Sequence, residues 1–312
     1  MISRGSRCGG AEDAAKGPAS GVGSCKQDPY FIKNKGETSV VKETDNLDLG
    51  QIAESGQCFR WQQLAPGTYG IPVGKRYLTA RQKGQQIQLS CPEEEWEVFW
   101  KSYLDWDTDY GWIQQQADKN DPFLQQAIRC GRGIRLLRQD LWEVVASFVI
   151  SQNNNIPRIK GCIERLCRAW GDWTAADCPA GGFYTFPAPE RLAAREREDL
   201  AEAGLGYRDR YLLAAARWFQ GISDCEKQKL GSRELLAVPG IGIKVASCIC
   251  LYGLHDLSVC PVDVWVKRII EEVYQGVRPR WMDSPWAGVY QQYCFVYERF
   301  RKGAGARNTP RV

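Results

Sequence analysis

Histidine is nearly absent from this 312-residue chain, which contains a single one, His255. Chemistry that depends on a pair of histidines is therefore excluded, and a Ser-His-Asp triad would have to use this one residue. His255 lies in the loop 253–257, between apolar segments, and we expect its side chain at the surface. A catalytic base in this protein is then expected to be a carboxylate or an amine.

Long apolar runs are missing as well. No segment reaches the roughly 18 apolar residues that a membrane-spanning helix needs, and residues 1–25 lack the apolar centre of a signal peptide. The 13 cysteines are odd in number and scattered, which favours reduced thiols over disulfides. We therefore expect an intracellular protein with no membrane partner, located in the cytoplasm or nucleoid of a bacterium or in the nucleus of a eukaryote.

What the chain does contain is enough apolar material for two well-packed domains. Hydrophobic residues make up 44% of the sequence, twelve of them tryptophan, and this length allows two substantial cores. The formal net charge is only +4, so any strongly basic surface must be local.

The pattern along the chain predicts an α+β protein. Residues 1–36 are rich in Gly, Ser and Ala and are expected to be disordered. Short alternating runs, such as 77–81 and 86–90, predict an N-terminal domain over 37–124 with an antiparallel β-sheet and helices. Helical periodicity predicts a mainly α-helical domain over 125–302, and 303–312 form a basic tail. The longest helices are expected at 140–151, 156–170, 189–203, 208–219 and 285–301.

The most informative motif is the segment 239–244, PGIGIK. It predicts a tight hairpin between two short helices, with Gly240 and Gly242 permitting the turn. The N–H groups at the start of the second helix have no partner within the helix and suit a phosphate. Lys244 falls in the first turn of that helix. Such hairpins also occur in non-catalytic proteins, and a lysine at this position is most often a solvated charge.

Nineteen positions after Lys244, the segment Pro261-Val-Asp263 precedes an amphipathic run. Asp263 is a natural helix N-cap, and alone it would most often be only that. A phosphate-binding hairpin, an amine and a carboxylate within so short a segment form a group that packing does not require.

These residues resemble the helix-hairpin-helix GPD superfamily of DNA glycosylases, and Lys244 resembles the lysine of its bifunctional members. Three further segments resemble the 8-oxoguanine DNA glycosylase family: SGQCFRW at 55–61, SQNNNIPR at 151–158 and GLGYRDR at 204–210. The resemblance extends from about residue 46 to residue 301.

The resemblance implies an enzyme that flips 8-oxoguanine out of double-stranded DNA and excises it. Lys244 would attack the sugar and form a Schiff base, from which β-elimination cuts the strand, and Asp263 would stabilise positive charge on the sugar. The lesion pocket would contain the Gly56 carbonyl, Cys248, Gln291 and Phe295. Gln291 as solvated surface and Phe295 as core are the structural alternatives.

The resemblance also assigns residues to the opposite strand. Tyr207 would act as a wedge, Asn153 would fill the space that the flipped base leaves, and Arg158 and Arg208 would recognise the orphaned cytosine. Without the resemblance, Tyr207 could be core, Asn153 a turn residue, and either arginine a phosphate ligand. Trp265 departs from the family, whose eukaryotic members typically have histidine there, and puts a phosphate contact in doubt.

No metal site and no cofactor are expected. Cys294 is the only cysteine after Asp263, whereas relatives similar to endonuclease III have four there for an iron–sulfur cluster. The fold leaves room for a monovalent cation at the hairpin carbonyls, and we expect a monomer. Two alternatives are a monofunctional glycosylase for alkylated purines, which generally lacks the lysine, and a non-catalytic helix-hairpin-helix protein that binds DNA.

Overall fold

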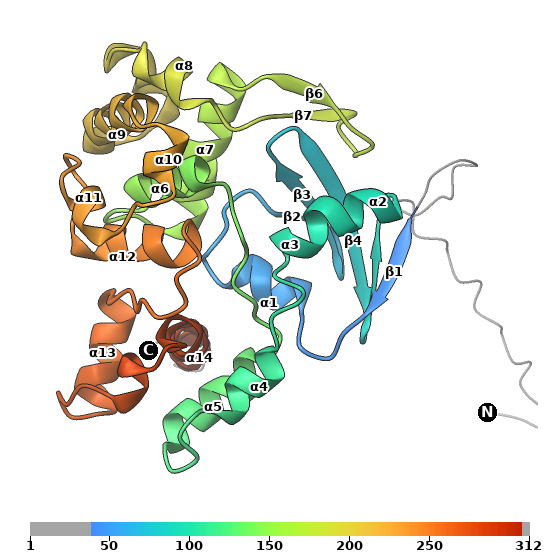
Figure 1. The fold of residues 1–312 in the computed structure, drawn as a ribbon, viewed down its shortest axis with the longest axis vertical. Helices are drawn as coiled ribbons and strands as arrows, with labels where there is room; N and C mark the ends of the chain where they lie inside the picture. The colour runs from blue at the N-terminus through green and yellow to red at the C-terminus, as the bar shows by residue number, and fades with distance from the viewer. Residues whose placement is uncertain (1–38, 308–312) are drawn as a thin grey trace, which may run out of the picture.

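A five-stranded antiparallel sheet dominates the first domain of the computed structural model, which describes residues 39–307 (Figure 1). The tail predicted over residues 1–36 lies outside this range. The strands are ordered β1-β5-β4-β3-β2, and the two predicted strands at 77–81 and 86–90 pair as neighbours. Their bounds are β1 Val40–Glu43, β2 Gln62–Ala65, β3 Thr68–Val73, β4 Arg76–Lys83 and β5 Gln86–Leu89.

Helical segments cover this sheet. The acidic residues predicted to begin a helix after Pro92 lie in its first turn, where they complement the helix dipole. Trp96 and Trp100, in the π-helical part of this segment, are fully buried in one apolar cluster with sheet residues such as Leu78. The helices of this part are α1 Leu49–Glu54, α2 Glu93–Glu95, η2 Trp96–Trp100, α3 Lys101–Tyr103, α4 Tyr110–Gln115 and α5 Pro122–Gly131.

The second part of the chain is mainly helical, which confirms the predicted α+β fold class. Its elements are α6 Leu141–Ile150, α7 Ile156–Trp170, β6 Trp173–Ala175, β7 Gly182–Tyr184, α8 Pro189–Ala193, η3 Glu198–Ala203, η4 Gly206–Arg208, α9 Asp209–Gly221, α10 Asp224–Lys227, α11 Ser232–Leu236, α12 Ile243–Tyr252, α13 Val264–Glu272, η5 Arg280–Asp283 and α14 Ala287–Arg307. Among the described residues, no helix combines the length and apolar character needed to cross a bilayer.

Two helix predictions need correction. The helix expected over 189–203 is interrupted: α8 ends at Ala193, and a 3-10 segment follows over Glu198–Ala203. The C-terminal helix α14 continues to Arg307, into the segment 303–312 that we predicted as a basic tail. The β6–β7 hairpin was not predicted. It extends toward the sheet (Figure 1), where its Phe183 ring lies 5.5 Å from the ring of Tyr77.

The prediction for His255 is wrong, because its side chain is 9% exposed. Its Nε2 lies 3.1 Å from the Leu136 carbonyl oxygen and 3.4 Å from Asp105 Oδ2. Asp105 also accepts a hydrogen bond from Arg138. Burial opposes ionisation of Asp105, but the partners His255 and Arg138 more than offset it and lower the pKa of its carboxyl. The only histidine therefore joins the two parts of the chain.

Candidate active site

A cavity of about 810 Å³ lies where the two domains meet the hairpin. Its walls come from the loop after α1, the loop between α6 and α7, the first turns of α12 and α13, and α14. Its lining contains three cationic side chains and one carboxylate, namely Lys244, Lys267, Arg299 and Asp263. This excess of positive charge suits a polyanionic ligand.

The predicted hairpin joins α11 to α12, and Gly240 is the residue that the turn requires. Its φ is +87°, and a Cβ there would lie 2.2 Å from the Tyr211 ring, far inside van der Waals contact. Gly242 differs: its φ of −91° suits any residue and a Cβ would meet nothing within 4 Å. The prediction that the turn needs Gly242 is therefore wrong, although Gly242 lines the cavity as the N-cap of α12.

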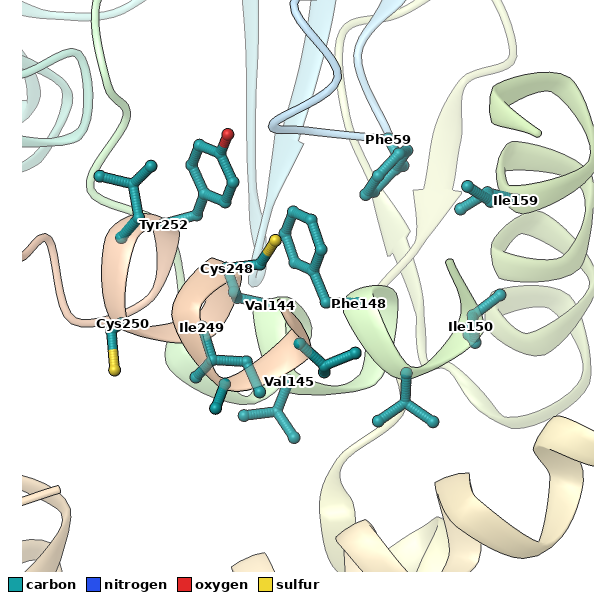
Figure 2. Packing of buried hydrophobic residues seen from close by; sticks show 14 of the residues in the cluster. Phe59, Val144, Val145, Phe148, Ile150, Ile159, Cys248, Ile249, Cys250 and Tyr252 are labelled. Carbon is teal, nitrogen blue, oxygen red and sulfur yellow. The ribbon is translucent and has the colours of Figure 1, made fainter. Parts of the chain in front are cut away.

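Lys244 lies in the first turn of α12, as predicted, and lines the cavity. Its Nζ lies 5.4 Å from the centroid of the Phe148 ring. Cys248, one turn further along α12, is buried beside the same ring (Figure 2). Burial raises the pKa of the Cys248 thiol to about 11 although the charge of Lys244 opposes the increase, so this wall of the cavity is a neutral thiol at pH 7.

Asp263 is the N-cap of α13, and its Oδ1 accepts hydrogen bonds from the N–H groups of Trp265 and Val266 at 3.0 and 2.9 Å. Both bonds use the same oxygen, so the cap does not require Oδ2. Burial raises the pKa of the Asp263 carboxyl above the usual range, although the two N–H groups and the charge of Lys244 oppose the increase. The predicted amine and carboxylate thus line one cavity.

Gly56, Gln291 and Phe295, which the resemblance assigns to a lesion pocket, all line this cavity, and we call them the lesion-facing wall after that predicted role. Gly56 has a φ of +78°, and a Cβ there would lie 3.5 Å from the Phe295 ring, so the backbone and the ring are close together. Gln291 is 3% exposed, and its Oε1 has no hydrogen-bond partner in the described structure. Buried polar atoms are rarely left unpaired, so a free acceptor in a cavity wall indicates a place for a ligand donor.

Asn153, Arg158 and Tyr207, which we call the opposite-strand group after their predicted role, are all exposed. Of the three, Asn153 lines the cavity. Asn153 has a φ of +45°, and its Nδ2 donates to the Tyr207 hydroxyl at 3.0 Å. Arg158 donates to the Gly204 carbonyl at 3.4 Å.

Arg208 is unlike the other residues predicted beside it, because it is 3% exposed. Its guanidinium donates to three backbone carbonyls, those of Gln152, Leu205 and Asn153, at 2.6, 3.0 and 2.7 Å. Three of its five N–H donors are therefore used within the protein, and the side chain holds the loop that carries Asn153.

Several lining residues were missed by the sequence analysis. Phe148 looked like any apolar residue of a buried helix, and Arg299 like a solvated charge near the C-terminus. In the structure Arg299 lies over the Phe295 ring at 5.2 Å. Trp265 lines the cavity and lies 5.0 Å from the Arg268 guanidinium, which places a cation beside the position where relatives have histidine.

Metal ligands are not grouped in the part of the chain that the structure describes: within 39–307 no three His, Cys, Asp or Glu side chains could hold an ion together. The eleven cysteines of that part are unpaired. The cavity therefore offers an amine, a carboxylate, aromatic surfaces and an unpaired amide oxygen. Such a set can bind a flat polar ring, attack an electrophilic carbon beside it and stabilise positive charge.

Comparison with known families covers most of the described chain. Residues 39–145 match the family model for the N-terminal domain of 8-oxoguanine DNA glycosylase, and residues 146–279 match that for HhH-GPD superfamily base excision DNA repair proteins. The junction of the two models lies inside α6, whereas we predicted a boundary at 124/125, and the domain bounds stay a prediction.

Among solved structures, that of MBOgg1 in complex with a low-affinity DNA ligand has 34% identity and a TM-score of 0.78, covering 87% of this chain and 99% of that one. The Clostridium acetobutylicum 8-oxoguanine glycosylase/lyase, in complex with double-stranded DNA containing cytosine opposite 8-oxoG, has 31% identity and a TM-score of 0.78, covering 87% and 98%.

Among curated proteins, the N-glycosylase/DNA lyase of Saccharomyces cerevisiae is 37% identical over 162 residues, 46% of this chain and 43% of the yeast protein. Three curated relatives are matched over 43%, 65% and 57% of their own lengths, so the chain spans less than two thirds of each.

Proposed function

The chain belongs to the 8-oxoguanine DNA glycosylase family of the helix-hairpin-helix GPD superfamily, and on this premise we propose that it is a bifunctional DNA glycosylase and AP lyase. It excises 8-oxoguanine opposite cytosine from double-stranded DNA in base excision repair, and then cuts the strand at the resulting site. The DNA partner of the related structures supports this substrate.

One observation carries the proposal: Lys244 and Asp263 line a single cavity together with the unpaired amide oxygen of Gln291. A non-catalytic DNA-binding module needs none of these three groups. A monofunctional glycosylase needs the carboxylate but generally lacks the amine. The combination is what a lysine-based attack beside a recognised base requires.

The reaction begins when the neutral Lys244 amine attacks C1′ of the flipped nucleotide. The bond from C1′ to the base nitrogen breaks, and the base leaves with its bonding electrons and takes up a proton. The ionised Asp263 carboxylate stabilises the positive charge that develops on the sugar. The sugar ring then opens as the lysine nitrogen loses its proton, which gives an imine between Nζ and C1′.

The lyase step follows from the imine. Loss of a proton from C2′ expels the 3′ phosphate by β-elimination, which cuts the strand. Water then hydrolyses the imine and frees the lysine. None of these steps needs a metal ion or a cofactor, and a monovalent cation at the hairpin carbonyls would only help to hold the phosphate backbone.

Recognition of the oxidised base rests on its N–H at N7, where guanine has a lone pair instead. The Gly56 carbonyl accepts this N–H, and with guanine it would face a second acceptor. Phe295 stacks on one side of the base and Cys248 packs on the other. The free Oε1 of Gln291 accepts from the N–H donors on the Watson–Crick edge, which its burial and lack of a partner support.

On the opposite strand, Arg158 donates to the acceptors O2 and N3 of the orphaned cytosine, Asn153 fills the gap and Tyr207 acts as the wedge. Arg208 has two N–H donors beyond those that hold the loop, and it contributes them to the same cytosine. The hairpin residues Gly240 and Gly242 bind a phosphate through the N–H groups at the start of α12. We propose that the enzyme acts as a monomer inside the cell.

The test is covalent trapping with borohydride on a duplex containing 8-oxoguanine opposite cytosine, with release of the free base measured alongside. Lys244→Gln should bind the duplex but give no covalent product, because an amide cannot form an imine. Lys267→Gln is the matched control, since it removes the other lysine of the cavity and should weaken binding but still trap at saturating DNA. Trapping by Lys244→Gln, or base release without any trapping in the wild type, would refute the bifunctional mechanism.

A further inference from the structure

The loop that carries Gly56 is fixed from both sides by buried hydrogen bonds. On one side, the Ser55 carbonyl accepts from Gln292 Nε2 at 2.6 Å. On the other, the Gln57 side chain donates to the Arg135 carbonyl and accepts from the Leu137 N–H. Because Ser55 and Gln57 are each 1% exposed, water does not compete for these bonds, and the backbone at Gly56 has one arrangement.

The amide of Gln292 makes a second hydrogen bond through its oxygen. The Tyr252 hydroxyl donates to Gln292 Oε1 at 2.6 Å. This fixes the orientation of the amide, because a flipped amide would set its oxygen against the Ser55 carbonyl oxygen. Gln292 is 0% exposed and Tyr252 is 5% exposed, so neither has solvent as an alternative partner.

Tyr252 in turn lies against the ring under the proposed nucleophile. Its ring is stacked on that of Phe148, with centroids 5.1 Å apart and an interplanar angle of 9° (Figure 2). Lys244 Nζ lies over the same Phe148 ring. A continuous series of contacts therefore runs from the amine through Phe148, Tyr252 and Gln292 to the backbone beside Gly56.

We propose that Tyr252 and Gln292 are specificity-determining positioning residues. They hold the Gly56 carbonyl in the position where it accepts the N7–H of the oxidised base, while Lys244 faces the sugar. This inference rests on the proposed function of the cavity. Gln292 does not line the cavity, and Tyr252 lines it with a hydroxyl that is already bonded to Gln292. Their effect comes from holding Ser55, because the strength of a hydrogen bond depends on the distance and angle at which the carbonyl meets the N–H.

The test separates base recognition from the chemistry of the sugar. Gln292→Leu removes both hydrogen bonds at similar volume, and Tyr252→Phe removes only the donor while keeping the stacked ring. Single-turnover excision of 8-oxoguanine is compared with strand cleavage at a preformed abasic site, which needs Lys244 but no base recognition. We expect Gln292→Leu to lower excision about tenfold to a hundredfold, Tyr252→Phe to lower it less, and both to cleave the abasic site at the wild-type rate.

A binding measurement gives the same comparison without catalysis. With Lys244→Gln as background, the affinity ratio between an 8-oxoguanine duplex and a guanine duplex should fall about tenfold when Gln292→Leu is added. Adding Tyr252→Phe to Gln292→Leu should not lower this affinity ratio further, because Tyr252 acts through its hydrogen bond to Gln292.

Gln82→Leu is the matched control. Gln82 likewise uses both ends of its amide, which donates to the carbonyls of Leu47 and Gly84 and accepts from the N–H of Leu49 at the start of α1. Its loss should lower stability without selective loss of excision. Equal losses of excision and abasic-site cleavage in Gln292→Leu, or unchanged excision in both variants, would overturn the positioning role. A wild-type chain that excises no 8-oxoguanine would overturn the proposed function as well, so the two failures are distinguishable.

Discussion

The lesion-facing wall and the opposite-strand group of Asn153, Arg158 and Tyr207 differ in how their polar atoms are paired before DNA binds. In the wall, Gln291 is buried with an acceptor left free. In the opposite-strand group, Asn153 and Tyr207 are exposed and are hydrogen-bonded to each other. The wall can therefore select a base without rearranging, whereas the other group must exchange its internal bonds for bonds to DNA. If the proposed roles hold, selectivity for the lesion is present before binding, and selectivity for the opposite base is gained on binding.

The largest effect on the excision rate is expected at Asp263, whose proposed role is in the reaction itself and not in either recognition region. Asp263→Asn keeps the helix cap, because Asn caps as well as Asp, but removes the charge. We expect excision to fall about a hundredfold or more opposite every base, with binding preferences for lesion and opposite base unchanged. Single-turnover excision and duplex affinity are the measurements, and a near-native rate would reduce Asp263 to a cap.

The pH dependence of the wild type follows from the same carboxyl. Burial raises the Asp263 pKa, so excision should fall with decreasing pH at a higher pH than an ordinary aspartate would give. Because the folded state holds this proton more tightly than the unfolded state, the ionised carboxylate lowers stability as pH rises. Asp263→Asn should therefore unfold at the wild-type temperature or above it at pH 7.

The next largest effect on excision is expected from a substitution that changes only the lesion-facing wall. Gly56→Ala adds a methyl group beside Phe295 at a φ of +78°, and we expect excision to fall about tenfold or more while abasic-site cleavage persists. Gly74→Ala is the matched control, because its φ is +55° but nothing lies within 4 Å. Both variants should lose roughly 1 kcal/mol of stability from the left-handed backbone, and only Gly56→Ala should lose excision. Equal excision by the two variants would remove Gly56 from recognition.

A smaller effect tests the opposite-strand group. Arg158→Ala should reduce the preference for cytosine over adenine about tenfold, with little change in stability, because Arg158 is exposed. Arg208→Ala should also weaken that preference, but it leaves three backbone carbonyls without a partner, each worth about 1–3 kcal/mol. It should therefore lower excision opposite all four bases and lower the unfolding temperature. Excision measured opposite each base decides this, and uniform losses in Arg158→Ala would indicate a phosphate contact instead.

The smallest effect on excision is expected at His255, which lies in neither region. His255→Ala should lower the free energy of unfolding at pH 7 by about 1–3 kcal/mol and leave excision at 25 °C unchanged. The pKa of Asp105 is lowered in the folded state, so its stabilisation is present above the ordinary aspartate pKa and is lost as pH falls through the folded value. Denaturant unfolding should therefore show that the free energies of unfolding of the wild type and His255→Ala become equal in acid.

Local patterns in the sequence were sufficient for the fold class and for the elements that carry the chemistry. The strand at 77–81 and the hairpin before Lys244 depend on neighbouring residues only, and both form where predicted, although only Gly240 of the two glycines is required by the turn. The prediction of one helix over 189–203 was wrong because its periodicity continues through residues 194–197, three of them charged, where the structure has no α-helix. Periodicity alone does not show where tertiary contacts interrupt a helix.

Residues whose role depends on distant partners could not be predicted. His255 is buried because Asp105 and Leu136, far away in the sequence, come to it. Gln292 was passed over because only the fold brings it to Ser55. The hairpin glycines, Lys244 and Asp263 were found from local motifs, whereas the other predicted site residues came from resemblance to a family. The roles of all of them remain predictions.

The helix α14 has a consequence for the order in which the protein becomes competent. Gln292 and Arg299 meet the carbonyls of Ser55 and Glu54 across 237 and 245 residues. Contacts of such separation are costly to close early and form late in folding. As the chain leaves the ribosome, Lys244 and Asp263 emerge before α14 does. On the proposed roles, a growing chain therefore contains its nucleophile before the lesion-facing wall is complete, because Gln291, Gln292 and Phe295 all belong to α14.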